Sequence, residues 1–236
     1  MTLKNVTDDE LARLAKLGLV AVKQGELLQR VKQGILDADW TLGELQRLIE
    51  GKLGDAASQL TSWVEFYQKR GIQLDAGVVL IPEKRPGFDR LIVVAQGVAP
   101  QWSYDECKKL FLCWKWTNNL DEIVQSVRMA KNGPYAIWVR ERVEADEELK
   151  DLSANVLEKR KIAGITLEER LVYESKYFKE TGKHLDIKNL TLCSGSRDSV
   201  GFVPIVYWND FDGELHVVWF DPGHHDGDLR ARAAVS

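Results

Sequence analysis

Two stretches near the C-terminus, Val203-Pro204-Ile205-Val206-Tyr207-Trp208 and Leu215-His216-Val217-Val218-Trp219-Phe220, decide the expected fold. Both are rich in β-branched and aromatic residues, and the polar segment 209–213 between them ends in glycine, so they predict a β-hairpin. Successive side chains of a strand point to opposite faces, so the alternation predicts one buried face and one open face. The predicted buried set is Val206, Trp208, Leu215, Val217 and Trp219. Pointing the other way are Ile205, Tyr207, His216, Val218 and Phe220, of which all but Val218 are predicted to be substantially exposed.

Helices and strands alternate along the rest of the chain. Residues 1–70 carry apolar residues at helical spacing, with capping boxes at Thr7–Glu10 and Thr41–Glu44. Short β-branched runs predict strands at 77–81, 91–95, 135–139 and 190–193. Further helices are predicted from a capping box at Ser103–Glu106 through Trp114, from Asn119 through Val127, over 146–160, and over 167–180 before Gly182. This order indicates an α+β protein, with a helical N-terminal module at 1–70 followed by an α+β domain at 71–236.

Composition excludes several classes of protein. The hydrophobic and charged fractions, 44% and 29%, are those of a soluble globular protein, and a net charge of −4 argues against a nucleic-acid-binding surface. No apolar run reaches the roughly 18 residues of a membrane span, and the first residues do not form an export signal. A cytoplasmic location is therefore expected, with surface display by another route left open. Three cysteines are too few for a disulfide framework.

No motif predicts a reaction. Ser194-Gly195-Ser196 lacks the Gly-x-Ser-x-Gly arrangement of a nucleophile elbow and is typical of a polar turn. His224, His225, Asp226 and Asp228 are residue types that ligate zinc, but adjacent histidines on a glycine-flanked loop rarely converge on one ion. Trp208-Asn209-Asp210 coincides with a calcium signature of sugar-binding C-type lectins, whose second acidic tripeptide is missing here. No cofactor or metal is expected, and a metal-dependent hydrolase using His216, His224 and His225 stays a lesser alternative.

The composition of the tail is skewed. No Lys, Gln or Met follows Lys188, and Glu214 is the only glutamate there. Strands and turns use few long polar side chains, but surface loops normally carry lysine. Aromatic, His, Asn and Asp side chains instead crowd the hairpin and its loops, and such a mixture is typical of a recognition surface. The candidate ligand-binding residues are Asp198, Ser199, Phe202, Ile205, Tyr207, Asn209, Asp210, His216, Val218, Phe220, His224, His225, Asp226 and Asp228.

Several motifs carry a resemblance. They are Tyr135-Ala136-Ile137-Trp138-Val139-Arg140-Glu141-Arg142, Thr181-Gly182-Lys183-His184-Leu185-Asp186, Cys193-Ser194-Gly195-Ser196-Arg197 and Leu229-Arg230-Ala231-Arg232. Through them most of the chain resembles a group of bacterial proteins whose residues between Gly-Ser-Arg and Leu-Arg-x-Arg differ between members. That pattern is similar to the variable proteins of diversity-generating retroelements, whose C-terminal segment is rewritten by mutagenesis at adenines. Asparagine codons altered at adenines yield the residue types that crowd the tail, and they cannot yield Lys, Gln, Glu, Met or Trp.

The resemblance implies a C-type-lectin-like domain that displays a variable segment, here 194–228, with Trp208, Trp219 and Glu214 as scaffold. It implies a non-enzymatic protein that binds a macromolecule, expected to be a protein, through the open face of the hairpin. The oligomeric state and the identity of the ligand stay open. The main alternative is an α+β protein whose tail is an ordinary structural β-sheet.

Overall fold

The computed structural model describes residues 54–236, and the chain divides into two compact units, Met1–Ala57 and Ser58–Ser236. The helices expected before residue 54 lie outside the described residues. The last part of the helical region expected at 1–70 is confirmed as α3, Gly54–Gln68. Within the second unit, the indole N–H of Trp63 donates to the carbonyl of Leu91, and the hydroxyl of Tyr67 donates to that of Val93. These bonds join α3 to the following strand, and the division between the units precedes the expected boundary at residue 70.

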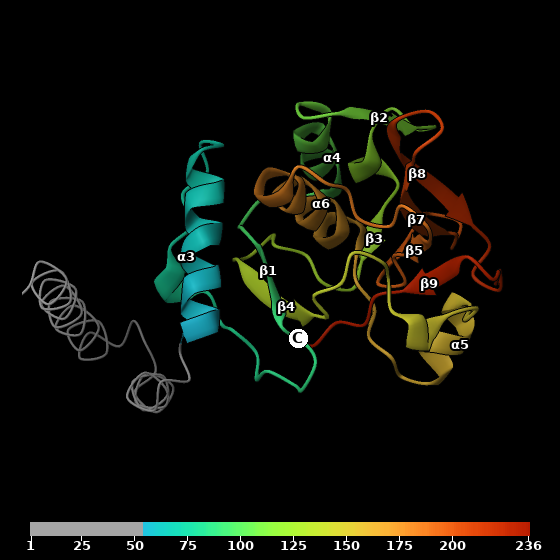
Figure 1. The fold of residues 1–236 in the computed structure, drawn as a ribbon, viewed down its shortest axis with the longest axis horizontal. Coiled ribbons are helices and arrows are strands. Elements are labelled where there is room, and N and C mark those ends of the chain that lie inside the picture. Colours follow the sequence, from blue (N-terminus) through green and yellow to red (C-terminus); the bar gives the residue numbers. More distant parts are fainter. Residues whose placement is uncertain (1–53) are drawn as a thin grey trace, which may run out of the picture. The chain divides into compact units, whose positions relative to one another are not determined.

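The second unit mixes short helices and strands, as expected for an α+β protein (Figure 1). Its helices after α3 are α4 (Pro100–Lys108), α5 (Ala154–Lys159) and α6 (Leu167–Thr181), with 3-10 turns at Ala76–Val78, Leu120–Glu122 and Glu147–Leu149. Its strands are β1 (Arg90–Val94), β2 (Leu112–Lys115), β3 (Gln125–Ser126), β4 (Tyr135–Val139), β5 (Leu190–Leu192), β6 (Ser196–Arg197), β7 (Val203–Asn209), β8 (Glu214–Phe220) and β9 (Leu229–Ala231). None of the helices from residue 54 onward is both long and apolar enough to cross a membrane.

The strands form one main sheet and two small ribbons. The main sheet has five strands in the order β2-β8-β7-β5-β9, in which β7 and β8 form the predicted antiparallel hairpin. β2 pairs parallel with β8, and β9 pairs parallel with β5. β1 pairs with β4, and β3 with β6. The chain end returns to β4 through a bridge between Trp138 and Val235, so the C-terminus lies beside β4 in Figure 1.

Helix α6 is the element whose limits follow most directly from the sequence. Thr166 accepts from the backbone N–H of Glu169, and the Glu169 carboxylate accepts from the backbone N–H of Thr166, which completes the predicted capping box. Gly182 ends the helix in the left-handed conformation, with φ of 68°. The helix packs against α4, β1 and β7, and from Leu167 to Lys176 all of its residues are buried.

Four predicted elements are wrong. The helix expected from Asn119 through Val127 is only a 3-10 turn, Leu120–Glu122, capped by Asn119, because the chain then pairs with β6 as strand β3. The strand expected at 77–81 is a 3-10 turn, Ala76–Val78, followed by extended chain. The helix expected to start at Ser103 starts at Pro100, because proline suits the first turn, and it ends at Lys108; residues 112–115 are strand β2. The helix expected over 146–160 is broken into a 3-10 turn and α5, and α5 is capped by Ser153.

A buried ionic cluster joins α6 to the sheet. It consists of Arg170, Glu174, Asp186 and Arg232, all less than 2% exposed. Arg170 donates to Asp186 at 2.9 Å and to Glu174 at 2.7 Å, and Arg232 donates to the other oxygen of Asp186 at 2.7 Å. Burial alone would lower the pKa of Arg170, but the two carboxylates raise it above its ordinary value. Two cations and two anions balance in this cluster, so its charges are paired inside the protein.

Candidate functional site

The pairing register of the hairpin confirms which side chains share a face. Tyr207 lies opposite His216, and Ile205 opposite Val218, while Val206 lies opposite Val217. Cross-strand partners point to the same side of a sheet, so the two predicted sets do occupy opposite faces.

Burial follows the predicted split only in part. Val206, Leu215 and Val217 are fully buried as predicted, but Trp208 and Trp219 are only half-buried. Ile205, predicted to be exposed, is fully buried, because its strand has a partner on each side: it lies between Leu192 of β5 and Val218 of β8. Tyr207, His216 and Phe220 are half-buried rather than substantially exposed.

The half-buried side chains of the hairpin are partly covered by a strand that was not predicted from the sequence. β2 places Trp114 beside His216 and Leu112 beside Glu214, on the open side of the hairpin. The Trp114 and His216 rings lie 5.4 Å apart, and Trp114 itself is 44% exposed. We call this surface the aromatic face; it consists of Leu112, Trp114, Tyr207, His216, Val218 and Phe220.

A signal for β2 exists in the sequence. Residues 111–116 are all apolar or aromatic apart from Lys115, and they end at the turn-forming Thr117-Asn118-Asn119. The pairing of β2 with β8 cannot be read from that signal, since the two strands are far apart in the chain. Without the pairing, nothing assigns Leu112 and Trp114 to the same surface as the hairpin.

His216 lies at the centre of the aromatic face. Its Nδ1 is 3.5 Å from the Tyr207 hydroxyl, and its Nε2 lies 3.7 Å from carboxylate oxygens of both Asp212 and Glu214. Nε2 is buried and makes no hydrogen bond within the described chain. Burial raises the pKa of Tyr207, with a smaller contribution from Asp212, so its hydroxyl keeps its proton at neutral pH. The centre of the face therefore offers hydrogen-bonding groups set among rings.

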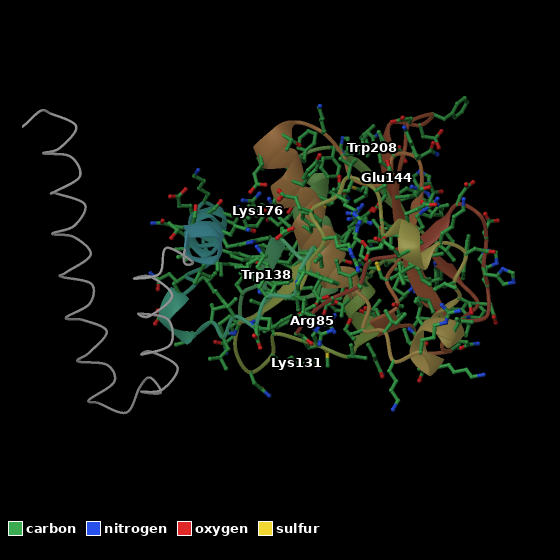
Figure 2. All side chains as sticks on the ribbon, turned by 60° about the horizontal axis from the view of Figure 1, so that its bottom comes forward. Arg85, Lys131, Trp138, Glu144, Lys176 and Trp208 are labelled. Carbon is green, nitrogen blue, oxygen red and sulfur yellow. The ribbon has the colours of Figure 1, made fainter. Side chains whose placement is uncertain are left out.

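The opposite face attaches the hairpin to the rest of the domain. Trp208, labelled in Figure 2, stacks on His184 with ring centroids 3.3 Å apart and planes 6° apart. His184 in turn contacts Glu174 of the ionic cluster at 3.0 Å. Trp219 packs edge-on against Trp116, 5.1 Å between centroids, and its indole N–H has no hydrogen-bond partner among residues 54–236. These contacts fit the scaffold role expected for both tryptophans.

The first loop of the candidate site contains one residue that belongs to the scaffold. Asp198 is buried, and its carboxylate accepts from the backbone N–H groups of Val200 and Phe202 at 3.0 and 2.8 Å. It therefore stabilises the turn. Ser199 and Phe202 are exposed beside it.

The remaining candidates lie in two exposed loops. In the hairpin turn, Asn209 accepts from the backbone N–H of Phe211, while Asp210 and Phe211 face solvent. In the loop after β8, His224 packs against Phe220 with ring centroids 4.5 Å apart.

His225, Asp226 and Asp228 of that second loop are exposed. His225 contacts Asp151 at 2.9 Å, and Asp226 accepts from the backbone N–H of Asp228. His216, His224 and His225 thus have separate partners. Over residues 54–236, no group of three or more His, Cys, Asp or Glu side chains is placed so that it could hold a metal ion.

The geometry supplies rings and hydrogen-bonding groups on an open surface, which suits binding by contact. Comparisons of the chain with family models, with curated proteins and with solved structures found no significant match. The functional argument therefore depends on the residues of this chain.

Proposed function

We propose that this is a non-enzymatic binding protein, in which the aromatic face and its adjoining loops recognise a protein partner. The observation that carries the proposal is the aromatic face itself. Trp114, Tyr207, His216 and Phe220 come from three strands, and each keeps part of its ring in contact with solvent. Aromatic side chains supply a large contact area at a low cost in conformational entropy, and for that reason they dominate the energetics of protein interfaces.

We further propose that segment 194–228 is a diversified region of the kind found in variable proteins of diversity-generating retroelements, on a C-type-lectin-like domain. The skewed composition of the tail supports this. The packing around the hairpin also supports it. Adenine changes in asparagine codons cannot yield Trp208, Glu214 or Trp219, and the two tryptophans of this set pack against the scaffold. Within this proposal Asp198 and Ile205 belong to the scaffold, because both are buried.

The DNA neighbourhood tests the diversification directly. We expect a reverse-transcriptase gene near this coding sequence, together with a near-copy of the codons for 194–228 that differs at adenines. Sequencing the flanking DNA provides the measurement. A neighbourhood that holds neither feature would refute diversification, while leaving the aromatic face to be tested separately.

A display library tests the aromatic face without knowledge of the natural partner. Tyr207, His216, Val218, Phe220, the exposed positions 199 and 202, and the half-buried position 224 are randomised together. The library is displayed on yeast and selected against purified streptavidin. We expect most members to remain folded and some to bind. A matched library randomised at Val206, Leu215 and Val217 serves as the control, and it should be largely unfolded. Loss of folding in both libraries would favour an ordinary structural sheet.

A further inference from the structure

A second concave site lies away from the aromatic face, between the β3–β6 ribbon and α5. It is an open cleft of about 620 Å³, within the size range of small-ligand sites. Its walls include the apolar side chains of Val127, Leu157 and Ile162, and its charged lining residues are Arg128, Glu158, Lys161 and Arg197. Arg128 is neutralised by two bonds to Glu169, at 2.7 and 2.8 Å. Arg197 and Lys161 therefore face only one lining carboxylate, that of Glu158.

Arg197 is held in place without being neutralised. Its Nη1 donates to the backbone carbonyls of Ser194 and Ser196, at 2.7 and 2.9 Å. The nearest carboxylate, on Glu158, is 3.9 Å from Nη2 and 78% exposed, so it contributes little as an ion pair. The Arg197 side chain is 29% exposed, and burial lowers its pKa, although an arginine keeps its charge. A half-buried guanidinium fixed by carbonyls is well suited to bind an added carboxylate.

The cleft also contains an unsatisfied hydroxyl. Ser194 Oγ is buried and has no hydrogen-bond partner in the described protein, although Ser194 lines the cleft. It lies against Gly164, where a Cβ would come within 1.8 Å of it. Gly195 is equally confined, since a Cβ there would lie 2.8 Å from the Gly164 carbonyl. Buried polar atoms normally have a partner, and rotation of the Ser194 side chain into the cleft would bring its hydroxyl to a ligand oxygen there.

We propose that this cleft binds a carboxylate carried next to an aliphatic group, as in an acidic or C-terminal residue of a peptide. Arg197 provides charge and two donors, Ser194 provides a hydroxyl, and Val127, Leu157 and Ile162 contact the aliphatic part. The shared chemistry admits two sources, a side-chain carboxylate and a chain terminus. The site uses none of the residues of the aromatic face, and binding there does not require binding at that face, although Ser194 and Arg197 fall at the start of the segment 194–228 proposed to be diversified.

Titration followed by nuclear magnetic resonance tests the proposal with small probes. The probes are acetyl-Leu-Glu amide, its neutral counterpart acetyl-Leu-Gln amide, and acetyl-Gly-Leu with a free C-terminal carboxylate. We expect saturable shifts of the Arg197 Nε–H signal and of the Ser194 and Gly195 amides with one or both acidic probes, and none with the neutral one. The acidic probe that binds more tightly identifies the source of the carboxylate. Equal shifts with the Gln and Glu probes, or no saturable shift at all, would overturn the proposal.

Matched variants assign the binding to the cleft. Arg197→Ala should abolish saturable binding, and Ser194→Ala should weaken it about fivefold, the usual effect of one hydrogen bond. If Arg197→Ala fails to fold, Lys161→Ala, an exposed change, should still weaken binding about twofold. Lys179→Ala, outside the cleft, should leave the affinity unchanged, as should the joint replacement of Tyr207, His216, Phe220 and His224 by serine. Unaltered binding by folded Arg197→Ala or by Lys161→Ala would place the probe elsewhere.

Discussion

The buried ionic cluster and the aromatic face belong to the same unit of the chain, but their polar groups differ in how far they are hydrogen-bonded. Arg170 and Asp186 are fully buried and bonded to each other and to further charged groups. On the aromatic face, by contrast, His216 keeps an unbonded ring nitrogen, and its side chain is 15% exposed. Trp208 and His184 lie between the two regions and connect them by a stacked pair.

This difference separates stability from recognition. A buried charge without its partner costs several kcal/mol, so the ionic cluster tolerates little change. Half-exposed rings contribute less to folding, and their unsatisfied groups are available to a partner. Mutations should therefore have large effects on stability in the first region and small effects in the second.

Replacing Asp186 by asparagine should produce the largest effect. Asparagine keeps the size of the side chain and tolerates the positive φ of 54° at this position, so the change isolates the charge. Arg170 and Arg232 would then share one buried carboxylate, and we expect a loss of about 3–5 kcal/mol in the free energy of unfolding. Urea denaturation measures it, with the exposed Asp210→Asn as control. Equal stability of the two variants would contradict the role of the cluster.

The stability of the protein should depend on pH through Glu168, a second buried acid of α6. Burial, followed by the charge of Glu169, raises the pKa of Glu168 to about 7. Between its ordinary value of 4.5 and 7, the folded protein holds more protons than the unfolded chain, so stability falls as pH rises through this range. The fall should be about 3 kcal/mol larger than in Glu168→Gln. Parallel pH profiles of the two proteins would show that Glu168 is already ionised at low pH.

Trp219→Ala should have an intermediate effect. The side chain is half-buried, so we expect a loss of about 2 kcal/mol, less than the 3–5 kcal/mol expected for a tryptophan in the core. Trp138→Ala, which removes a ring only 1% exposed, is the matched comparison. Thermal denaturation of both variants measures the difference. A Trp219 variant as unstable as the Trp138 variant would show that Trp219 is a core residue.

Phe211→Ser should have the smallest effect on stability. Phe211 lies in the hairpin turn and is 95% exposed, so its loss should change the unfolding free energy by about 0.5 kcal/mol at most. The melting temperature measures it, and Phe66→Ser, a change at a buried ring, provides the contrast. A large loss in Phe211→Ser would mean that the turn is structural and does not belong to the proposed diversified segment 194–228.

Elements that depend on local sequence signals, such as a capping box or a β-branched run, were predicted well. The capping box at Thr166 and the glycine at 182 set the limits of α6, and the β-branched runs located β4, β7 and β8 to within about a residue. Features that depend on pairing between distant strands could not be predicted. The burial of Ile205 requires β5 on one side and β8 on the other, and the place of Trp114 requires the parallel pairing of β2 with β8.

Among the candidate site residues predicted from the sequence, Tyr207, His216 and Phe220 are partly exposed, whereas Asp198 and Ile205 are buried. The prediction omitted Leu112 and Trp114. The orientation of side chains follows from the period of a strand, whereas their exposure depends on which elements lie alongside.

The pairing of β2 with β8 also determines when the aromatic face can assemble. Trp114 is synthesised about a hundred residues before His216, its neighbour across the pair. Contacts between such distant positions form late, because a long loop must close before the contact stabilises anything. Until β8 has emerged from the ribosome, the rings of Trp114 and Trp116 have no strand to pack on, so the nascent chain carries exposed aromatic surface of the kind that chaperones protect.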